Sequence, residues 1–190
     1  MPTPTEVVVE VAGVLEELNV PYVVVGSFAS SARGVRRATI DADIVAEVTI
    51  DHVKGIVDKL SSKDFYIDDE AVRRAITSER AFNAIHRESM FKVDVYVARD
   101  DFTKKEIERK VAEKILPNSN TVVYIATAED TVVAKLAWFR KGGEVSDRQW
   151  SDVLGVLKVQ KGRLDHAYMR EWCERLAVRD LLNKAIAEAA

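Results

Sequence analysis

One stretch near the N-terminus constrains the fold more than any other part of the chain. A short apolar run, residues 22–25, ends at Gly26 and Ser27, and 13 residues separate Ser27 from Asp41 and the nearby Asp43. Side chains two apart in an extended strand point the same way, so both carboxylates are predicted to share one face of a sheet. Such a pair indicates either a metal site or a solvated turn, since Asp favours turns and is depleted in strands.

A third aspartate favours the metal site. Asp94 lies within the apolar run 91–97, where an unpaired charge would be costly to bury. A divalent cation shared with the acidic pair would neutralise it. An ion pair with Lys92 or Arg99 is the alternative.

The composition excludes several other classes of site. A single cysteine, Cys173, rules out an internal disulfide and a Cys-rich zinc cluster, and the three histidines are too far apart for a zinc ligand pattern. The net charge of -3 disfavours an extended nucleic-acid footprint. No apolar run approaches the roughly 20 residues that span a bilayer, and the N-terminus lacks a signal-like segment. We therefore expect a cytoplasmic protein that does not enter membranes.

Residues 1–126 predict a mixture of helices and strands. Apolar residues at helical spacing predict a helix over 5–19, with Thr5 as its N-cap and Pro21 closing it. Further helices are predicted at 27–32, 52–60, 70–76 and 102–109. Strands are predicted at 22–25, 44–50, 65–67, 81–86, 90–97, 111–116 and 122–125.

Residues 127–190 contain no proline and predict successive amphipathic helices. Thr127 and Ser146 each begin a pattern typical of a helix N-cap, and two more helices are expected after Gly162. The tryptophans of this half are predicted to pack between helices. The chain as a whole is expected to be α+β, with a change of architecture near residue 127.

The spacing of these motifs resembles the nucleotidyltransferase superfamily, which includes DNA polymerase beta and the small antibiotic-modifying nucleotidyltransferases. The shared features are Gly-Ser after an apolar strand, then Asp-x-Asp, then a single Asp in a later apolar strand. Residues 129–152 also resemble nucleotidyltransferase-like proteins related to the toxins of abortive-infection systems. The resemblance implies a mixed sheet flanked by helices over 1–126, followed by a C-terminal helical bundle over 127–190.

The activity implied is magnesium-dependent transfer of a nucleoside monophosphate from an NTP, with ATP favoured, to a hydroxyl acceptor. Two Mg²⁺ ions would stabilise the attacking and leaving oxygens. Asp41 and Asp43 would hold the metals, and Asp94 would complete one of them and assist deprotonation of the acceptor. The acceptor could be a small molecule, a protein or an RNA end, and a homo-oligomer is left open. The alternative is a non-catalytic nucleotide-binding module or toxin-antitoxin partner that retains the fold.

The same resemblance implies a triphosphate cradle at Gly26 and Ser27, because glycine lets the backbone approach phosphates closely. Arg33, Arg36 and Arg37 precede the acidic pair, and Arg37 is the candidate for a phosphate contact. A solvated loop whose arginines balance the aspartates is the alternative.

Three further residues complete the predicted site. Thr39 lies two residues before Asp41 and is expected to hold its carboxylate. By resemblance, Lys135 could reach the triphosphate and Asp152 could join it, although periodicity alone predicts that both face solvent. Arg148 and Asp152, four residues apart, could instead form a surface ion pair.

Overall fold

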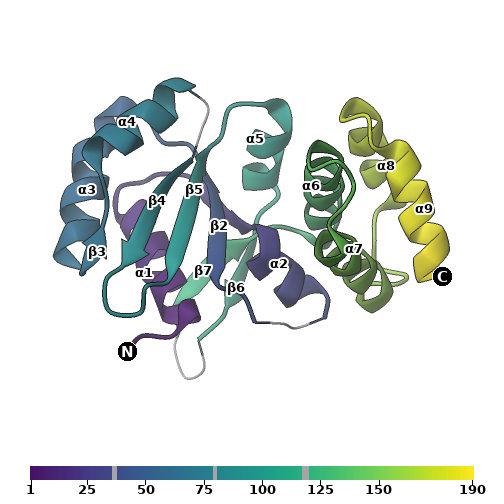
Figure 1. Ribbon diagram of the computed structural model, residues 1–190, viewed down its shortest axis with the longest axis horizontal. Coiled ribbons are helices and arrows are strands. Elements are labelled where there is room, and N and C mark those ends of the chain that lie inside the picture. Colours follow the sequence, from purple (N-terminus) through teal and green to yellow (C-terminus); the bar gives the residue numbers. More distant parts are fainter. Residues whose placement is uncertain (36–37, 79–80, 117–119) are drawn as a thin grey trace. The chain divides into compact units, whose positions relative to one another are not determined.

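The computed structural model shows that the chain forms two compact units, each built from two separate segments (Figure 1). The first unit joins Met1–Val25 to Thr39–Ile125, and the second joins Gly26–Ala38 to Ala126–Ala190. The sequence predicted two domains, 1–126 and 127–190, and that domain boundary stays a prediction. The residues that the structure describes are 1–35, 38–78, 81–116 and 120–190.

A mixed sheet forms the centre of the first unit. In the described part of the chain it has seven strands in the order β3-β4-β5-β2-β1-β7-β6. Strands β2 and β5 are parallel, as are β1 and β7, and the other neighbours are antiparallel. The strands are β1 (Tyr22–Val25), β2 (Asp41–Ala46), β3 (Phe65–Tyr66), β4 (Ala81–His86), β5 (Lys92–Val97), β6 (Val111–Lys114) and β7 (Val122–Ile125).

β2 differs more in its bounds from the sequence prediction than the other strands do. β2 begins at Asp41 and ends at Ala46, whereas the sequence predicted a strand over 44–50. It extends to Asp41 because its backbone pairs with β5 from that residue onward. β4 pairs with β5 and β6 pairs with β7, and both pairs are antiparallel.

The helices of the first unit begin with α1 (Pro4–Glu17). Its N-cap is Thr3 rather than Thr5, because the Thr3 hydroxyl accepts from the Glu6 amide at 3.3 Å and Glu6 accepts from the Thr3 amide at 2.7 Å. The helix ends at Glu17, before the predicted stop at Pro21. The unit also contains the short 3-10 turn η1 (Ile50–His52), α3 (Val53–Ser62), α4 (Asp69–Ser78) and α5 (Asp101–Glu108).

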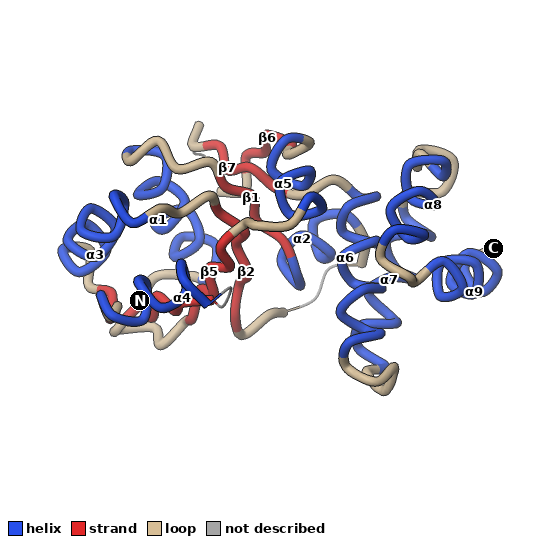
Figure 2. Tube along the Cα trace, turned by 90° about the horizontal axis from the view of Figure 1, so that it is seen from above, coloured by secondary structure: helices blue, strands red, loops and turns tan. Residues whose placement is uncertain are grey.

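Part of the hydrophobic core of this unit lies on one face of the sheet. α1 and α3 contact each other and lie on the same side of the strands (Figure 2). On β2 the core-facing side chains Ala42, Ile44 and Ala46 are fully buried. The alternate side chains of this strand therefore point to the opposite face, which leaves Asp41 and Asp43 away from this core.

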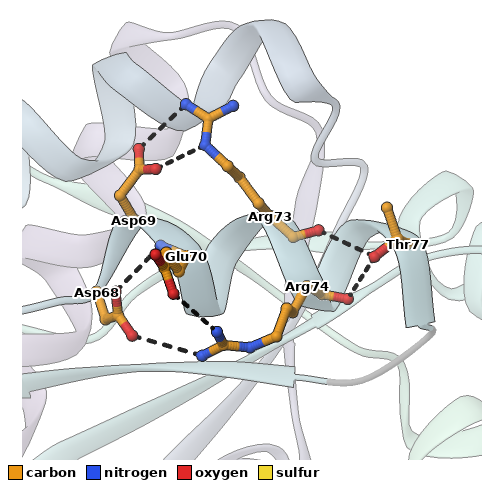
Figure 3. Close-up of polar contacts among 6 residues, drawn as sticks. All are labelled: Asp68, Asp69, Glu70, Arg73, Arg74 and Thr77. Carbon is orange, nitrogen blue, oxygen red and sulfur yellow. Dashed lines mark hydrogen bonds and ion pairs between the residues drawn. The ribbon is translucent and has the colours of Figure 1, made fainter.

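α4 carries an ion-pair network on its surface (Figure 3). Arg73 donates to Asp69 at 2.6 Å, and Arg74 donates to Glu70 at 3.2 Å, both one helical turn apart. Acidic residues in the first turn also suit the positive end of the helix dipole. These local interactions stabilise a helix that the sequence predicted over 70–76.

The second unit is helical. Its elements are α2 (Gly26–Arg33), α6 (Ala128–Lys141), α7 (Asp147–Val159), α8 (His166–Arg175) and α9 (Arg179–Ala189). The predicted N-caps Thr127 and Ser146 are confirmed, since their hydroxyls accept from the amides of Asp130 and Gln149. The predicted burial of the tryptophans is wrong for Trp138, which is 51% exposed.

No helix in the described ranges is both long and apolar enough to cross a membrane.

Candidate active site

Three carboxylates share one face of the sheet in the first unit. Asp43 of β2 lies directly opposite Asp94 of β5, and Asp41 lies opposite Lys92. Residues in register on neighbouring strands point to the same face, and so do residues two apart on one strand. The register therefore brings together Asp41, Asp43 and Asp94, the three acidic residues that the sequence singled out.

Two side chains hold the carboxylate of Asp94. Lys92 Nζ lies 2.6 Å from Asp94 Oδ2. The two residues therefore form one of the ion pairs that the sequence offered as an alternative to a metal. On the other neighbouring strand, Asn83 lies opposite Asp94 and its amide donates to Asp94 Oδ1. Sequence reasoning missed Asn83, although a polar amide inside a strand is itself a signal because Asn is depleted there.

The charges of the three carboxylates act on their neighbours. The hydrogen bond with Asp94 raises the pKa of Lys92, and the charges of Asp94, Asp41 and Asp43 add to that rise while burial opposes it. Burial raises the pKa of Tyr96 to about 12, with further contributions from Asp43, Asp94 and Asp41. Lys92 and Tyr96 therefore both lie within the electrostatic reach of the cluster.

Thr39 lies where the sequence predicts a supporting role. Its hydroxyl donates to the main-chain oxygen of Asp41 at 2.6 Å and lies 3.4 Å from the Asp41 carboxylate. This side chain fixes the start of β2, and so the position of the first carboxylate.

The donor set suits a hard divalent cation. Carboxylate oxygens are the ligands that Mg²⁺ prefers, and the three aspartates lie on a common face. Across the described residues, however, no three Asp, Glu, His or Cys side chains are grouped closely enough to hold a metal ion. Both oxygens of Asp94 are instead engaged by Lys92 and Asn83. The three aspartates thus match a metal site in the chemistry of their oxygen ligands and in the face of the sheet that they share. In this structure the cation beside Asp94 is the ammonium of Lys92.

The predicted phosphate-binding turn belongs to the second unit. Gly26 begins α2 with φ 62°, a left-handed conformation that favours glycine. The carbonyl of Ser27 accepts from the Ser30 hydroxyl at 3.1 Å. Arg33 Nε donates to the carbonyl of Ala126 at 2.8 Å, which ties α2 to the segment before α6. Arg36 and Arg37 lie outside the described residues.

Lys135 and Asp152 form a buried ion pair within the second unit. Lys135 Nζ of α6 lies 2.8 Å from Asp152 Oδ2 of α7, and the two side chains are 9% and 8% exposed. The periodicity argument that both face solvent is wrong, because the pair neutralises itself between two packed helices. Both residues were candidates from the sequence. Their contact could not be predicted from local periodicity, because they lie 17 positions apart in the chain.

Comparison with solved structures identifies the architecture. A crystal structure of ANT(2")-Ia in complex with adenylyl-2"-tobramycin matches 94% of this chain and 99% of its own, with a TM-score of 0.59 and 12% identity. The chain has a nucleotidyltransferase-like fold. Lincomycin-bound LnuA, a lincosamide antibiotic adenylyltransferase, matches 84% of this chain and 98% of its own, with a TM-score of 0.50 and 12% identity.

A nucleotidyltransferase-like protein from Paracoccidioides brasiliensis has the same architecture. It matches 97% of this chain and 92% of its own, with a TM-score of 0.51 and 16% identity. No protein-family model and no curated protein sequence matches the chain. The likeness is therefore one of fold, and it confirms the α+β class expected from the sequence.

Proposed function

We propose that this protein transfers a nucleoside monophosphate from an NTP to a hydroxyl acceptor. The observation that carries the proposal is the register of β2 and β5, which sets Asp94 beside Asp43 with Asp41 on the same face. That arrangement occurs in a fold shared with antibiotic adenylyltransferases. A structural role alone gives no reason for three carboxylates on one face, because like charges repel.

Each aspartate has a role in the proposed reaction. Asp41 and Asp43 would hold Mg²⁺ together with Asp94, and the bound ions would stabilise charge on the attacking and leaving oxygens. Asp94 would also accept the proton of the acceptor hydroxyl at a carboxylate oxygen. Asn83 orients that carboxylate through its amide, and Thr39 fixes the main chain at Asp41.

Donor binding is assigned by resemblance. It comprises Gly26, Ser27, Arg37, Thr39 and Lys135, with ATP as the favoured NTP. Lys135 is paired with Asp152 in this structure, so a contact with a triphosphate requires it to exchange that partner. Small hydroxylated molecules are the first acceptors to test, because the neighbouring structures include complexes named for tobramycin and lincomycin. Protein and RNA-end acceptors complete the panel.

The test is a transfer assay with purified protein. Each α-labelled NTP is incubated with Mg²⁺ and with hydroxylated antibiotics, a protein extract or tRNA, and labelled acceptor and pyrophosphate are measured. Wild-type protein is expected to label one acceptor class. Asp94→Asn is expected to lower the rate by about 10²–10⁴-fold, because the proton acceptor is lost.

The matched control is Asp58→Asn. Asp58 is a carboxylate of the same unit that is 60% exposed and pairs with Lys54 on α3, so its removal should leave transfer unchanged. Equal transfer by wild type and Asp43→Asn across all NTPs and acceptors would disprove the proposed chemistry. Nucleotide binding without transfer would instead favour the non-catalytic module.

A further inference from the structure

The carboxylate cluster contains a cation supplied by the chain itself. The Lys92 ammonium lies 2.6 Å from Asp94 Oδ2, and the Lys92 side chain is 40% exposed whereas that of Asp94 is 11% exposed. A half-exposed lysine can leave its partner by rotating its side chain, because solvent is available to hydrate the ammonium. The buried Asp94 carboxylate cannot follow it, since Asn83 holds its second oxygen.

The position of Lys92 follows from the sheet rather than from a flexible loop. Lys92 precedes Asp94 by two residues on β5, so both side chains point to one face. In register it faces Asp41 on β2 and Ile85 on β4. Lys92 therefore shares the face of the sheet that carries Asp41, Asp43 and Asp94.

We propose that Lys92 is a tethered counter-cation of the carboxylate cluster, which a divalent metal must displace from Asp94 in order to bind. The inference rests on the proposed function insofar as a metal is expected at Asp41, Asp43 and Asp94. Lys92 then has two effects: it limits repulsion among the carboxylates before the metal arrives, and it lowers the metal affinity of the site by competition.

A purely structural ion pair makes a different prediction. Removing such a pair would lower stability equally with and without metal. If Lys92 competes with the metal, removing Lys92 lowers the stability of the metal-free protein. It also increases the stabilisation that metal brings, because ligand binding to the folded state adds to its stability.

The experiment measures binding of Mn²⁺ alone, without nucleotide or acceptor, by calorimetry and by thermal unfolding with and without the metal. Lys92→Met removes the charge but keeps an unbranched side chain, and Lys92→Gln serves as a second neutral variant in case the first folds poorly. Both are expected to bind Mn²⁺ about tenfold more tightly than wild type. Lys92→Arg keeps the positive charge and is expected to show no such gain.

Lys54→Met is the matched control, since it removes one lysine from an exposed pair on α3 and changes the net charge equally. Unchanged Mn²⁺ affinity in both neutral variants, the same gain in Lys54→Met, or no Mn²⁺ binding by any protein would each overturn the proposal. The transfer assay tests the proposed function separately. If the protein is active but its Mn²⁺ affinity does not change when Lys92 is replaced, only the role of Lys92 is refuted.

Discussion

Breaking the Lys135–Asp152 pair should strongly destabilise the helical unit. The two side chains are 9% and 8% exposed and their charged atoms lie 2.8 Å apart, so neither charge is substantially hydrated. Lys135→Met removes the ammonium group that lies beside the buried Asp152 carboxylate. Removing one member of a buried pair typically costs about 3–5 kcal/mol, and we expect the free energy of unfolding to fall by that amount.

Replacing both residues should have a smaller effect than replacing one. In the double variant Lys135→Met, Asp152→Leu both charges leave the interior together, and apolar replacement of a buried pair is often close to neutral. The double variant should therefore recover most of the stability lost by Lys135→Met. The large non-additivity is the signature of a direct interaction.

Tryptophan fluorescence during urea unfolding measures this effect in the correct unit. All three tryptophans lie within the Ala126–Ala190 segment, so the signal follows unfolding of the helical unit. The control is Arg179→Met, which breaks an exposed pair of the same unit in which the two side chains are 51% and 65% exposed. It should cost less than about 1 kcal/mol.

Two results would refute this reasoning. One is a loss below about 1 kcal/mol for Lys135→Met, which would place the pair among exposed ones. The other is a double variant whose loss equals the sum of the two single losses.

Two further predictions concern packing and reactivity. Burial raises the pKa of Cys173 to about 12, so its thiol should stay protonated at pH 8 and react with a disulfide reagent only after urea unfolds the protein; rapid labelling of the native state would contradict this. Gly34→Ala should cost about 1–3 kcal/mol in urea unfolding, because a Cβ there would lie 2.8 Å from the Val156 amide nitrogen. Gly13→Ala, whose Cβ would meet nothing within 4 Å, should instead stabilise α1 by about 0.5–1 kcal/mol, and equal losses in both variants would show that the close approach at Gly34 is unimportant.

The acidic face could be predicted because it depends on short-range periodicity. Alternation along a strand places Asp41 with Asp43, and the apolar setting of Asp94 predicts that it needs a partner. Which partner it takes depends on the register between β4, β5 and β2, and that register is set by long-range pairing. The sequence could therefore offer Lys92 only as an alternative and gave no reason to connect it with Asn83.

In the helical unit, the helix caps could be predicted from the sequence but the burial of individual side chains could not. Its caps at Thr127 and Ser146 are local and were predicted correctly. Burial of Lys135 and exposure of Trp138 both depend on which neighbours pack against α6, and periodicity treats a lysine as solvent-facing and a tryptophan as buried. The assignment of Gly26, Ser27 and Lys135 to donor binding stays a prediction.

The interleaving of the two units along the chain has a consequence for synthesis. Gly26–Ala38 belongs with helices encoded after residue 125, so α2 leaves the ribosome long before the helices against which it packs. During translation the sheet unit can be completed while α2 still lacks its partners. Apolar α2 residues such as Ala29, which is fully buried in the folded protein, are then exposed until the C-terminal helices have been synthesised. Folding of the helical unit must therefore wait for the C-terminal segment, and a fragment ending near residue 125 would leave α2 without the helices that bury it.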